Sequence, residues 1–428
     1  MSITGSFYTG LSGLNTHGGA LSIIGDNIAN VNTSGFKSSN AQFEDILGLT
    51  LTGVLGNNNT GAGASIQNVD VNFVQGTFET TDVSTDVAIN GKGFFIVKDP
   101  TTYEKFYTRS GHFHFDNTGY FVNNTGYRVQ GYLYDDIGSS LIEILSDIQI
   151  NQNSMMPPST TTAAEMVLNL NSNDSTKTWD ITSPAADSNY SSPVTIFDTL
   201  GQSHVIEVYF TKTAANTWQW HSVIDGGDVS GGTPGTYVLF GSGESSDDLE
   251  FSSLTGALTS PTTAINFYDS SNAITYANGV AASAVTIDFT GTTQYGSESA
   301  IQSIIQDGYA AGSTALMSID EDGNIVANYT NGQVKRIARL ALSSFANING
   351  LQRKGETLFQ ETVSSGQPIT NKAGDGGMGN ISSSMLEESN VDLAGEMIKM
   401  IVIQRGYQAN SKVISTADEM LNTLINMR

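Results

Sequence analysis

The chain of 428 residues contains no cysteine. Disulfide bonds, cysteine-ligated zinc, iron–sulfur clusters and thiol nucleophiles are therefore excluded. The absence of thiols also suits a protein that must stay unfolded and uncrosslinked before export. The length allows two to four domains, since a domain usually spans roughly 100–200 residues.

Basic residues are scarce. Lysine and arginine number 18 against 42 aspartates and glutamates, which gives a net charge of −24. Binding to nucleic acid or to anionic membranes requires basic residues, so we expect neither partner. Residues 151–299 carry 15 acidic residues and only Lys177 and Lys212, a net charge of −13. This third of the chain is predicted to be a solvated outer domain.

Long apolar runs and catalytic motifs are also missing. No segment reaches the roughly 18 apolar residues of a membrane-spanning helix, so we expect no membrane insertion. The start of the chain lacks the basic and apolar regions of a Sec signal peptide, which leaves open an export route that removes no peptide. The sequence contains no nucleotide-binding, nucleophile-elbow or zinc-protease motif. His112 and His114 share a strand face without a third ligand nearby, and we expect no catalytic residue, metal or cofactor.

Apolar residues at the two ends of the chain recur with alternating spacings of four and three, the pattern of a coiled-coil seam. Within residues 1–35, the residues expected to mediate assembly are Phe7, Leu11, Leu14, Leu21, Ile24 and Ile28. Within residues 386–428, they are Leu393, Met397, Met400, Ile401, Tyr407, Ile414, Leu421 and Leu424. Seven glycines between Gly5 and Gly35 make the first helix marginal alone, so it should need packing partners.

Between these ends the sequence predicts short strands separated by turns. Residues 86–150 and 300–362 are expected to form an inner antiparallel β domain. Residues 151–299 should form an outer β domain inserted into the inner one, and residues 36–85 and 363–385 irregular connectors. The expected fold class is α+β and multidomain, with a coiled-coil stem formed by both chain ends and mainly antiparallel β domains.

Local signals make three further predictions. Asn90-Gly91 predicts a hairpin between the apolar residues that flank it. A second hairpin is predicted between the strand ending at Phe115 and the strand beginning at Tyr120. Asn390 or Asp392 is expected to cap the C-terminal helix, because both side chains can accept from free backbone N–H groups.

The stretch Asp26-Asn27-Ile28-Ala29-Asn30-Val31-Asn32-Thr33-Ser34-Gly35-Phe36-Lys37 closely resembles the N-terminal signature of the bacterial flagellar rod and hook axial proteins. Its side-chain amides, on Asn27, Asn30 and Asn32, can bond the backbone as the helix ends, and Gly35 permits a positive φ before Phe36. Further segments resemble the same family in the same order: Asp86 to Phe95, Thr108 to Gly119 and Leu386 to Asp392. Segments around Gln306, Tyr329 and Phe345 are similar to the hook members.

The resemblance implies a structural subunit of the flagellar hook. Such a subunit would self-assemble into a curved hollow helical tube, a flexible joint that passes torque from rod to filament. The implied partners are further copies of the chain, the distal rod protein, the hook–filament junction protein, the hook cap protein and the flagellar type III export apparatus. The implied location is extracellular, in a hook continuous with the basal body, and no enzymatic activity is implied.

Two alternatives remain open. A distal rod subunit would share both ends of the chain, but rod proteins are shorter and lack a domain equivalent to residues 151–299. A secreted β-rich adhesin would belong to a different class, and the missing signal peptide opposes it.

Overall fold

The structure, a computed structural model, describes residues 3–52, 57–135, 138–150, 155–242, 247–268, 274–282 and 284–426. The chain divides into two compact units. Unit 1 comprises Met1–Gln152, Leu316–Asn328 and Val334–Arg428, and unit 2 comprises Asn153–Ala315 and Tyr329–Gln333. The described residues are mostly antiparallel β-strand with long helices near both chain ends, as the sequence predicts.

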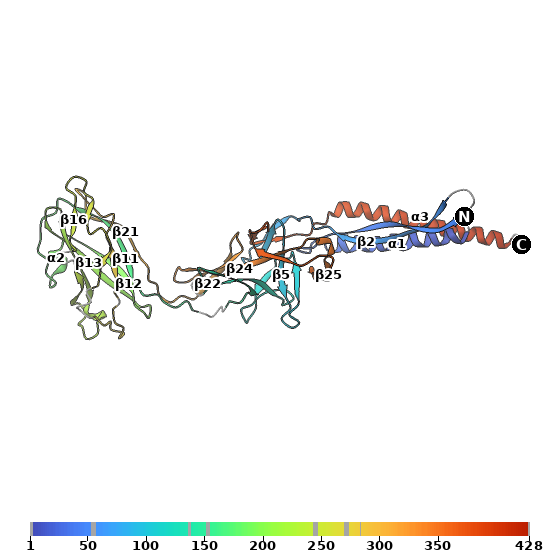
Figure 1. Cartoon of the computed structure of the whole chain (residues 1–428). Coiled ribbons are helices and arrows are strands. Elements are labelled where there is room, and N and C mark those ends of the chain that lie inside the picture. Colours follow the sequence, from blue (N-terminus) through green and yellow to red (C-terminus); the bar gives the residue numbers. More distant parts are fainter. Residues whose placement is uncertain are drawn as a thin grey trace. The chain divides into compact units, whose positions relative to one another are not determined.

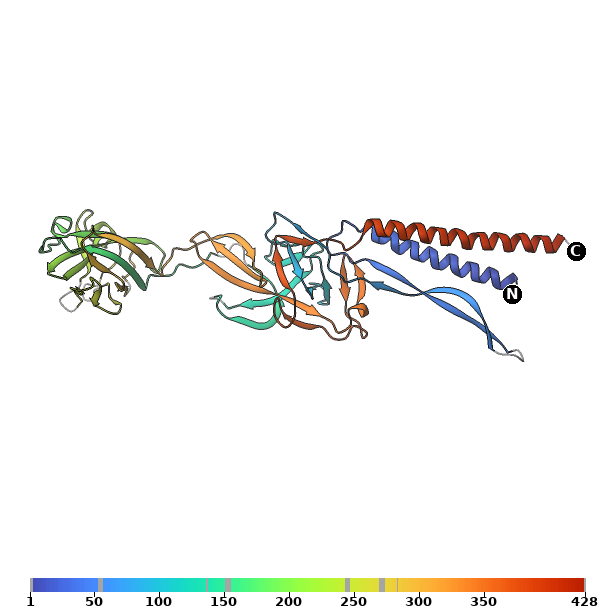
Figure 2. The same cartoon turned by 90° about the horizontal axis from the view of Figure 1, so that it is seen from above.

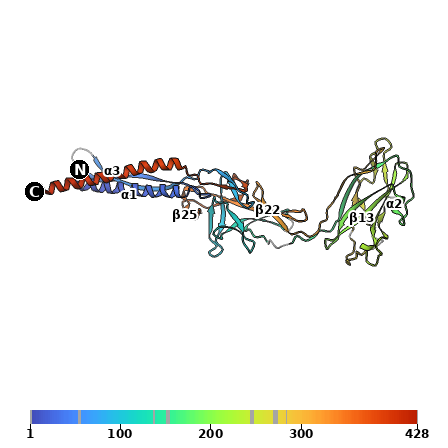
Figure 3. The same ribbon diagram turned by 180° about the vertical axis from the view of Figure 1, so that it is seen from behind.

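Unit 1 begins with helix α1 (Ile3–Ala29) and ends with helix α3 (Leu393–Asn426). The two helices lie side by side when viewed from the front (Figure 1), from above (Figure 2) and from behind (Figure 3). Strands β1 (Ser39–Thr52) and β2 (Asn57–Val71) pair as a long antiparallel hairpin that contacts α1. The two ends of the chain and this hairpin therefore form one bundle.

This hairpin corrects the prediction that residues 36–85 are irregular. Its glycines and asparagines suggest loop, but they permit a close approach to α1. A Cβ at Gly63 would clash with Ser12, and a Cβ at Gly19 would lie 2.6 Å from Ile66. Thr16 Oγ1 also donates to the carbonyl oxygen of Ala64 at 2.9 Å. Contact with α1 therefore stabilises a hairpin that its own sequence does not predict.

The body of unit 1 is a sheet whose strand order is β22-β23-β24-β9-β5-β6-β26-β25. Strand β10 pairs with β9, β8 joins β7 to β9, and β27 pairs with β24, while β4 pairs with β28 and β3 with β29. The bounds are β3 (Phe78–Thr80), β4 (Val87–Asn90), β5 (Phe94–Lys98), β6 (Lys105–Thr108), β7 (Phe113–Phe115), β8 (Phe121–Asn123), β9 (Arg128–Tyr134), β10 (Leu141–Asp147), β22 (Thr314–Ile319), β23 (Asn324–Tyr329), β24 (Val334–Ser344), η3 (Ile348–Gly350), β25 (Gln352–Gly355), β26 (Leu358–Gln360), β27 (Ile369–Lys372), β28 (Asn380–Ser383) and β29 (Met385–Glu387).

Strand β5 is buried on both faces. Phe95 and Val97 pack in one apolar cluster with residues of β4, β8, β9 and β24, and Phe94 and Ile96 pack in another that includes Tyr107. A strand covered on both faces needs apolar residues at consecutive positions, which explains the run Phe94-Phe95-Ile96-Val97. Strand β5 therefore lies between the two apolar clusters of unit 1.

Two local predictions are confirmed and one is wrong. The hairpin β7–β8 forms, and Asp392 caps α3, since its Oδ1 accepts from the Ala394 N–H at 3.1 Å. The hairpin at Asn90-Gly91 does not form, because β4 pairs with β28 and β5 pairs with β6, β9 and β24. The partner of β4 comes from the distant C-terminal segment, which a local turn signal cannot reveal. That segment, 363–385, contains β27 and β28 and is therefore not irregular as predicted.

Unit 2 has two sheets around one apolar core that includes Trp218, Trp220 and Phe240. One sheet has the order β18-β19-β11-β20 with β21 also on β11, and the other has the order β12-β13-β14-β16-β17 with β15 on β14. The pairings of β11 with β19 and β20 are parallel. The bounds are β11 (Ala163–Asn171), α2 (Pro184–Asp187), β12 (Tyr190–Phe197), β13 (Ser203–Ala214), β14 (Thr217–Asp225), η1 (Gly226–Asp228), β15 (Tyr237–Ser242), β16 (Leu249–Phe251), β17 (Leu258–Ser260), β18 (Ile265–Asn266), β19 (Thr286–Asp288), β20 (Thr293–Tyr295) and β21 (Ala300–Gln306).

Residues 300–315, predicted to lie in the inner domain, belong instead to unit 2. Strand β21 pairs antiparallel with β11, and the isolated bridges Ser159–Tyr309 and Met156–Gly312 continue the pairing of these two chain segments. The boundary therefore lies about 15 residues later than a change in composition suggests. These bridges also place the segment that enters unit 2 beside the segment that leaves it.

Candidate assembly surface

Small residues line the contact between α1 and α3. A Cβ at Gly10 would lie 3.0 Å from Ile414 Cγ1, and a Cβ at Gly13 would lie 2.7 Å from the side chain of Asn410. On the other helix, a Cβ at Gly406 would lie 2.8 Å from the ring of His17. Glycine at these positions therefore lets the two helix backbones approach closely, at the cost of helix propensity.

The face of α1 that packs within the chain is not the stripe of residues that we expect to mediate assembly. Its buried or contacting positions are Gly10, Gly13, His17, Ala20, Ile24 and Asn27. Apart from Ile24, which was predicted and is buried, these positions precede the predicted stripe by one residue, a rotation of about 100° around the helix. The remaining predicted residues, Phe7, Leu11, Leu14, Leu21 and Ile28, stay partly exposed or exposed. We call these five residues the outer α1 stripe.

On α3, the predicted set is divided between two faces. Met400, Ile414 and Leu421 are half-buried and Ala417 is buried on the side that packs within the chain. The predicted residues Leu393, Met397, Ile401 and Tyr407 remain exposed, between 45% and 50% of their surface. The side chain of Leu424 lies outside the described residues. Further exposed apolar residues on α3 are Ile398, Val402, Val413, Met420 and Ile425.

The two family signatures meet at a buried cluster of charges that we call the charge lock: Lys37, Arg109 and Glu387. Lys37 Nζ lies 2.5 Å from Glu387 Oε1, and Arg109 Nη1 lies 3.4 Å from Glu387 Oε2. The side chains of Lys37 and Glu387 are fully buried. Lys37 lies between α1 and β1, Arg109 follows β6, and Glu387 ends β29. The cluster therefore joins segments that are up to 350 residues apart.

Burial dominates the electrostatics of this cluster. It lowers the pKa of Lys37 and of Arg109, because desolvation disfavours a charged group, while Glu387 acts in the opposite direction on both. Arg109 also donates from Nη2 to the carbonyl oxygen of Gly91 at 2.9 Å, and its guanidinium lies 5.3 Å from the centre of the Phe94 ring. Within the lock, the Glu387 carboxylate therefore pairs with both cations.

Hydrogen bonds next to the lock connect the helices to the strands. Asn27 in α1 exchanges two hydrogen bonds with the backbone of Ser39, and its Nδ2 donates to Glu396 Oε2 in α3 at 3.2 Å. Asn390 accepts from the Ser38 N–H at 2.8 Å and donates to the carbonyl oxygen of Asn72 at 2.7 Å. Asn390 was expected as a possible helix cap, whereas Asp392 performs that role.

The other signature residues behave largely as their residue types suggest. Asn30 donates to the carbonyl oxygen of Asp26 at 2.8 Å, and Asn32 is exposed. Gly35 has a φ of +72°, and a Cβ there would clash with the backbone of Ser110. Phe36 is buried beneath the guanidinium of Arg353, which lies 4.8 Å from its ring centre. Most of these signature residues therefore make contacts within the chain, where α1 meets the β body.

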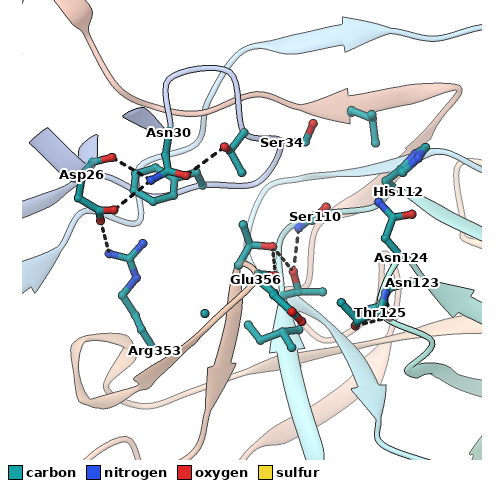
Figure 4. Close-up of a pocket in the computed structure, with 17 residues that line it drawn as sticks. Asp26, Asn30, Ser34, Ser110, His112, Asn123, Asn124, Thr125, Arg353 and Glu356 are labelled. Carbon is teal, nitrogen blue, oxygen red and sulfur yellow. Dashed lines mark hydrogen bonds and ion pairs between the residues drawn. The ribbon is translucent and has the colours of Figure 1, made fainter. Parts of the chain in front are cut away.

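A pocket of about 760 Å³ adjoins this junction (Figure 4). Arg353 reaches toward Asp26, at 3.9 Å, and Asn30 bonds Asp26 as well. His112, which also lines the pocket, pairs with Asp86 at 2.7 Å. These polar groups bind one another, and no nucleophile with an adjacent base occurs among the residues that line the pocket.

Neither a metal-binding cluster nor a membrane-spanning helix occurs in the part of the chain that the structure describes. No three His, Asp or Glu side chains there are grouped so that they could hold a metal ion. No helix among the described ranges combines the length and the apolar character needed to cross a membrane. His112 and His114, considered above as possible ligands, both lie exposed near the β7 strand.

The sequence did not predict the charge lock or the glycine contacts between α1 and α3. Lys37 and Glu387 were both within recognised motifs, but nothing local showed that they pair. Gly10 and Gly13, three residues apart on α1, and Gly406 on α3 were the available signal for a close helix contact. Large apolar residues gave the stronger periodic pattern, and they led to the neighbouring face.

Comparison with known proteins covers the chain from end to end. Family models match in four segments: "Flagella basal body rod protein" at 7–37, "Flagellar hook protein FlgE/F/G D1 domain" at 88–164, "Flagellar basal body protein FlaE D2 domain" at 169–309 and "Flagellar basal body rod FlgEFG protein C-terminal" at 382–427. The flagellar hook protein FlgE of Escherichia coli (strain K12) is 34% identical over 433 residues, which cover 99% of this chain and all of that protein. The chain belongs to the flagellar hook protein family.

Other relatives of the hook family agree with this assignment. FlgE of Treponema pallidum (strain Nichols) is 30% identical over 474 residues, and 99% of each chain is covered. The crystal structure of Helicobacter pylori flagellar hook protein FlgE2 matches with a TM-score of 0.51 at 18% identity, covering 72% of this chain and all of that one, and so supports the fold. This hook family member is a structural subunit, not an enzyme, and self-polymerisation in the hook and basal body follows from the family.

Proposed function

We propose that this hook subunit polymerises into a curved hollow tube, a flexible joint that passes torque from rod to filament. The observation that carries the proposal is the uncovered apolar surface of the terminal helices. The outer α1 stripe lies on a helix that contains Asp26 but no glutamate, lysine or arginine, and α3 exposes residues such as Ile398 and Ile401. Burying roughly ten such side chains at ~1.5–3 kcal/mol each would hold neighbouring subunits together.

In this proposal the chain ends, residues 1–35 and 386–428, form a coiled-coil stem at the inner wall of the tube. The heptad spacing of both chain ends supports this proposed stem. So does the offset of one residue between the α1 positions that contact α3 and the outer α1 stripe. An α1 helix with two usable stripes can pack on its own α3 and on a neighbouring copy at once. The strands of residues 36–85 and 363–385 would connect the stem to the inner β domain.

The outer domain is proposed to be an insertion in the inner domain, with the inner domain formed by residues 86–150 and 316–362. The pairing of Met156 with Gly312 supports this, because the chain then enters and leaves unit 2 at one place. The net charge of −13 on residues 151–299 favours weak contacts there that slide as the tube bends. Tight apolar contacts would be confined to the stem.

Specific partners are part of the same proposal. The subunit would contact the distal rod protein at one end of the tube and the hook–filament junction protein at the other. A hook cap protein would guide its addition, after passage through the flagellar type III export apparatus. Because the matched family includes basal body rod models at both chain ends, the stem is the region expected to continue from rod to hook. The assembled tube would be extracellular.

Replacement of Ile401 by Asp tests this function. Ile401 is half exposed in the single chain, so a carboxylate should leave the subunit folded, with a circular dichroism spectrum like that of the wild type. In the tube, the same carboxylate would be buried against a neighbour at a cost of several kcal/mol. We expect electron microscopy to show curved tubes for the wild type and no tubes for Ile401→Asp.

Ser415→Asp is the matched control, because Ser415 is exposed on the same helix and the residues three and four positions away on either side are all polar or charged. It adds the same charge and should still assemble. Normal tubes from Ile401→Asp, or equal loss in both variants, would contradict the proposal that the apolar face of α3 mediates assembly.

A further inference from the structure

Glu387 receives contacts from three separate segments of unit 1: residues 35–37, Gly76 and Arg109. Its Oε1 accepts from Lys37 Nζ and from the Gly76 N–H, at 2.5 and 2.9 Å, and its Oε2 pairs with Arg109. Its backbone carbonyl oxygen accepts from the Gly35 N–H at 2.7 Å. Carboxylates that accept several charge-assisted hydrogen bonds fix the geometry of the groups around them. The segment after α1, the segment after β2 and the β body are therefore all held in place by the Glu387 side chain.

The helices reach the β body of unit 1 through this place. Lys37 is ten residues after Asn27, which binds both Ser39 and Glu396, and Glu387 is six residues before the start of α3. Lys37 Nζ also donates to the carbonyl oxygen of Val74 at 3.0 Å, close to the end of β2. Each of the connections from stem to body, before β1, after β2 and before α3, is therefore tied to the lock or lies beside it.

We infer that the charge lock is a rigid joint between the terminal helices and the β body, and that Glu387 is the positioning residue on which this joint depends. Without it, the connections would keep only the pairing of β29 with β3 and neighbouring hydrogen bonds such as those of Asn27 and Asn390, and we expect the helices to swing. With it, the helices and the body turn as one piece. This consequence for torque rests on the proposed function, whereas the joint itself is a property of the single chain.

The charges within the lock are unbalanced, so its members should differ in how much their loss damages the joint. The lock holds two cations, Lys37 and Arg109, against one anion, and Arg109 Nε is buried without a hydrogen-bond partner within the described residues. Removing the anion leaves two buried cations uncompensated, whereas removing Lys37 leaves a balanced pair. Loss of Glu387 should therefore be much more damaging than loss of Lys37.

The experiment compares Glu387→Gln, Lys37→Met and the double variant in the full-length chain. Glu387→Gln keeps the size of the side chain and removes its charge, and Lys37→Met keeps the length and removes the cation. Hydrogen exchange is followed at the amides of Gly35, Ser38 and Gly76, which the lock and Asn390 engage. We expect roughly 100-fold faster exchange in Glu387→Gln and at most a few-fold change in Lys37→Met, with the double variant between them.

A second measurement separates a joint from general support of the fold. Because the chain has no native cysteine, Ser22→Cys in α1 and Lys105→Cys in β6 can carry the only two spin labels, and both sites are exposed. The distance distribution between the labels should be narrow in the wild type and in Lys37→Met, and broad in Glu387→Gln. Helix content and the tryptophan fluorescence of unit 2 should stay the same in all three.

Glu388→Gln serves as the control, because Glu388 is the exposed neighbour of Glu387 and its side chain accepts a hydrogen bond from Thr77 Oγ1 outside the lock. It should leave exchange and label distances unchanged. Equal effects of Glu387→Gln and Lys37→Met, or a broad distribution already in the wild type, would overturn the inference. Neither result depends on polymerisation, so a failed joint and a failed assembly surface are distinguished by comparison with Ile401→Asp.

Discussion

At the scale of single residues, His221 in β14 shows how burial sets chemistry in unit 2. Its ring stacks on Trp179, with ring centres 3.9 Å apart and planes 10° apart. Both ring nitrogens are buried without a hydrogen-bond partner among the described residues. This desolvation lowers the pKa of His221 from 6.5 to about 4. His221 is therefore neutral in the folded protein at physiological pH.

The lowered pKa predicts acid sensitivity of unit 2. Between pH 6.5 and about 4 the unfolded chain binds a proton at His221 and the folded chain does not, so the free energy of unfolding decreases as the pH falls through this window. Allowing for partial exposure, the loss should be about 2 kcal/mol. Denaturant unfolding followed by tryptophan fluorescence measures it, because Trp179, Trp218 and Trp220 are all in unit 2.

His221→Phe should remove this part of the pH dependence, since phenylalanine preserves a planar ring against Trp179 and cannot titrate. His114→Gln, which changes an exposed histidine of unit 1, should leave the dependence intact. The same loss of stability in acid for His221→Phe and the wild type would show that other groups are responsible.

Residue-level prediction from the sequence succeeded where the cause is local. Gly35 was expected to adopt a positive φ and does so, and Asn27 was expected to bond the backbone and binds Ser39. It failed for the charge lock, because Lys37 and Glu387 are brought together only by the complete fold. A charged residue within a sequence motif can be recognised locally, but the motif does not identify the residue with which it forms an ion pair.

At the scale of elements, the offset of one residue on α1 is the most informative difference from expectation. Hydrophobic periodicity locates the helix correctly and identifies the stripe of largest apolar residues. Contact within the chain, however, uses the stripe of smallest residues, since Gly10 and Gly13 permit a shorter distance to α3. One periodic pattern cannot show which partner covers which stripe. The missed β1–β2 hairpin has a similar cause, because its order comes from packing on α1.

A pair of glycine substitutions tests this packing. In Gly13→Leu the added side chain would begin 2.7 Å from Asn410 and should push α1 away from α3. In Gly25→Leu nothing lies within 4 Å of the new Cβ, and the helix gains roughly 0.8–1 kcal/mol of propensity. We expect faster hydrogen exchange in α1 and α3 for Gly13→Leu, and equal or slower exchange for Gly25→Leu. Similar exchange in the two variants would contradict a close α1–α3 contact.

At the scale of the whole molecule, the sequence predicted the class of fold and the family but not the domain boundary. Both terminal helices, the β-rich middle and the acidic composition of residues 151–299 were evident. Residues 300–315 were assigned to the wrong side because the pairing of β21 with β11 is not visible locally. Distant strand pairing, as in β4 with β28, was the general limit.

The outer domain can be removed at the place where its two connections pair. Replacing residues 157–311 with Gly-Gly would join Met156 to Gly312 through a two-residue turn, which suits adjacent antiparallel strands. The shortened chain should still form tubes, because the stem and the inner domain remain. We expect the tubes to be straight and unaffected by added salt, whereas the curvature of wild-type tubes should respond to salt that screens their acidic surfaces over ~8–10 Å. Microscopy at low and high salt measures both, and loss of tubes would assign the outer domain to the scaffold.

The central claim is that the apolar faces left open on α1 and α3 are the contacts between subunits. Electron cryomicroscopy of tubes assembled from the full-length chain tests it most directly. The account predicts that the two helices line the inner wall, and that Leu11 and Ile401 are buried against neighbouring copies while Gly13 still contacts Asn410 of its own chain. A tube in which Leu11 and Ile401 face solvent, with subunits joined through their β domains instead, would contradict it.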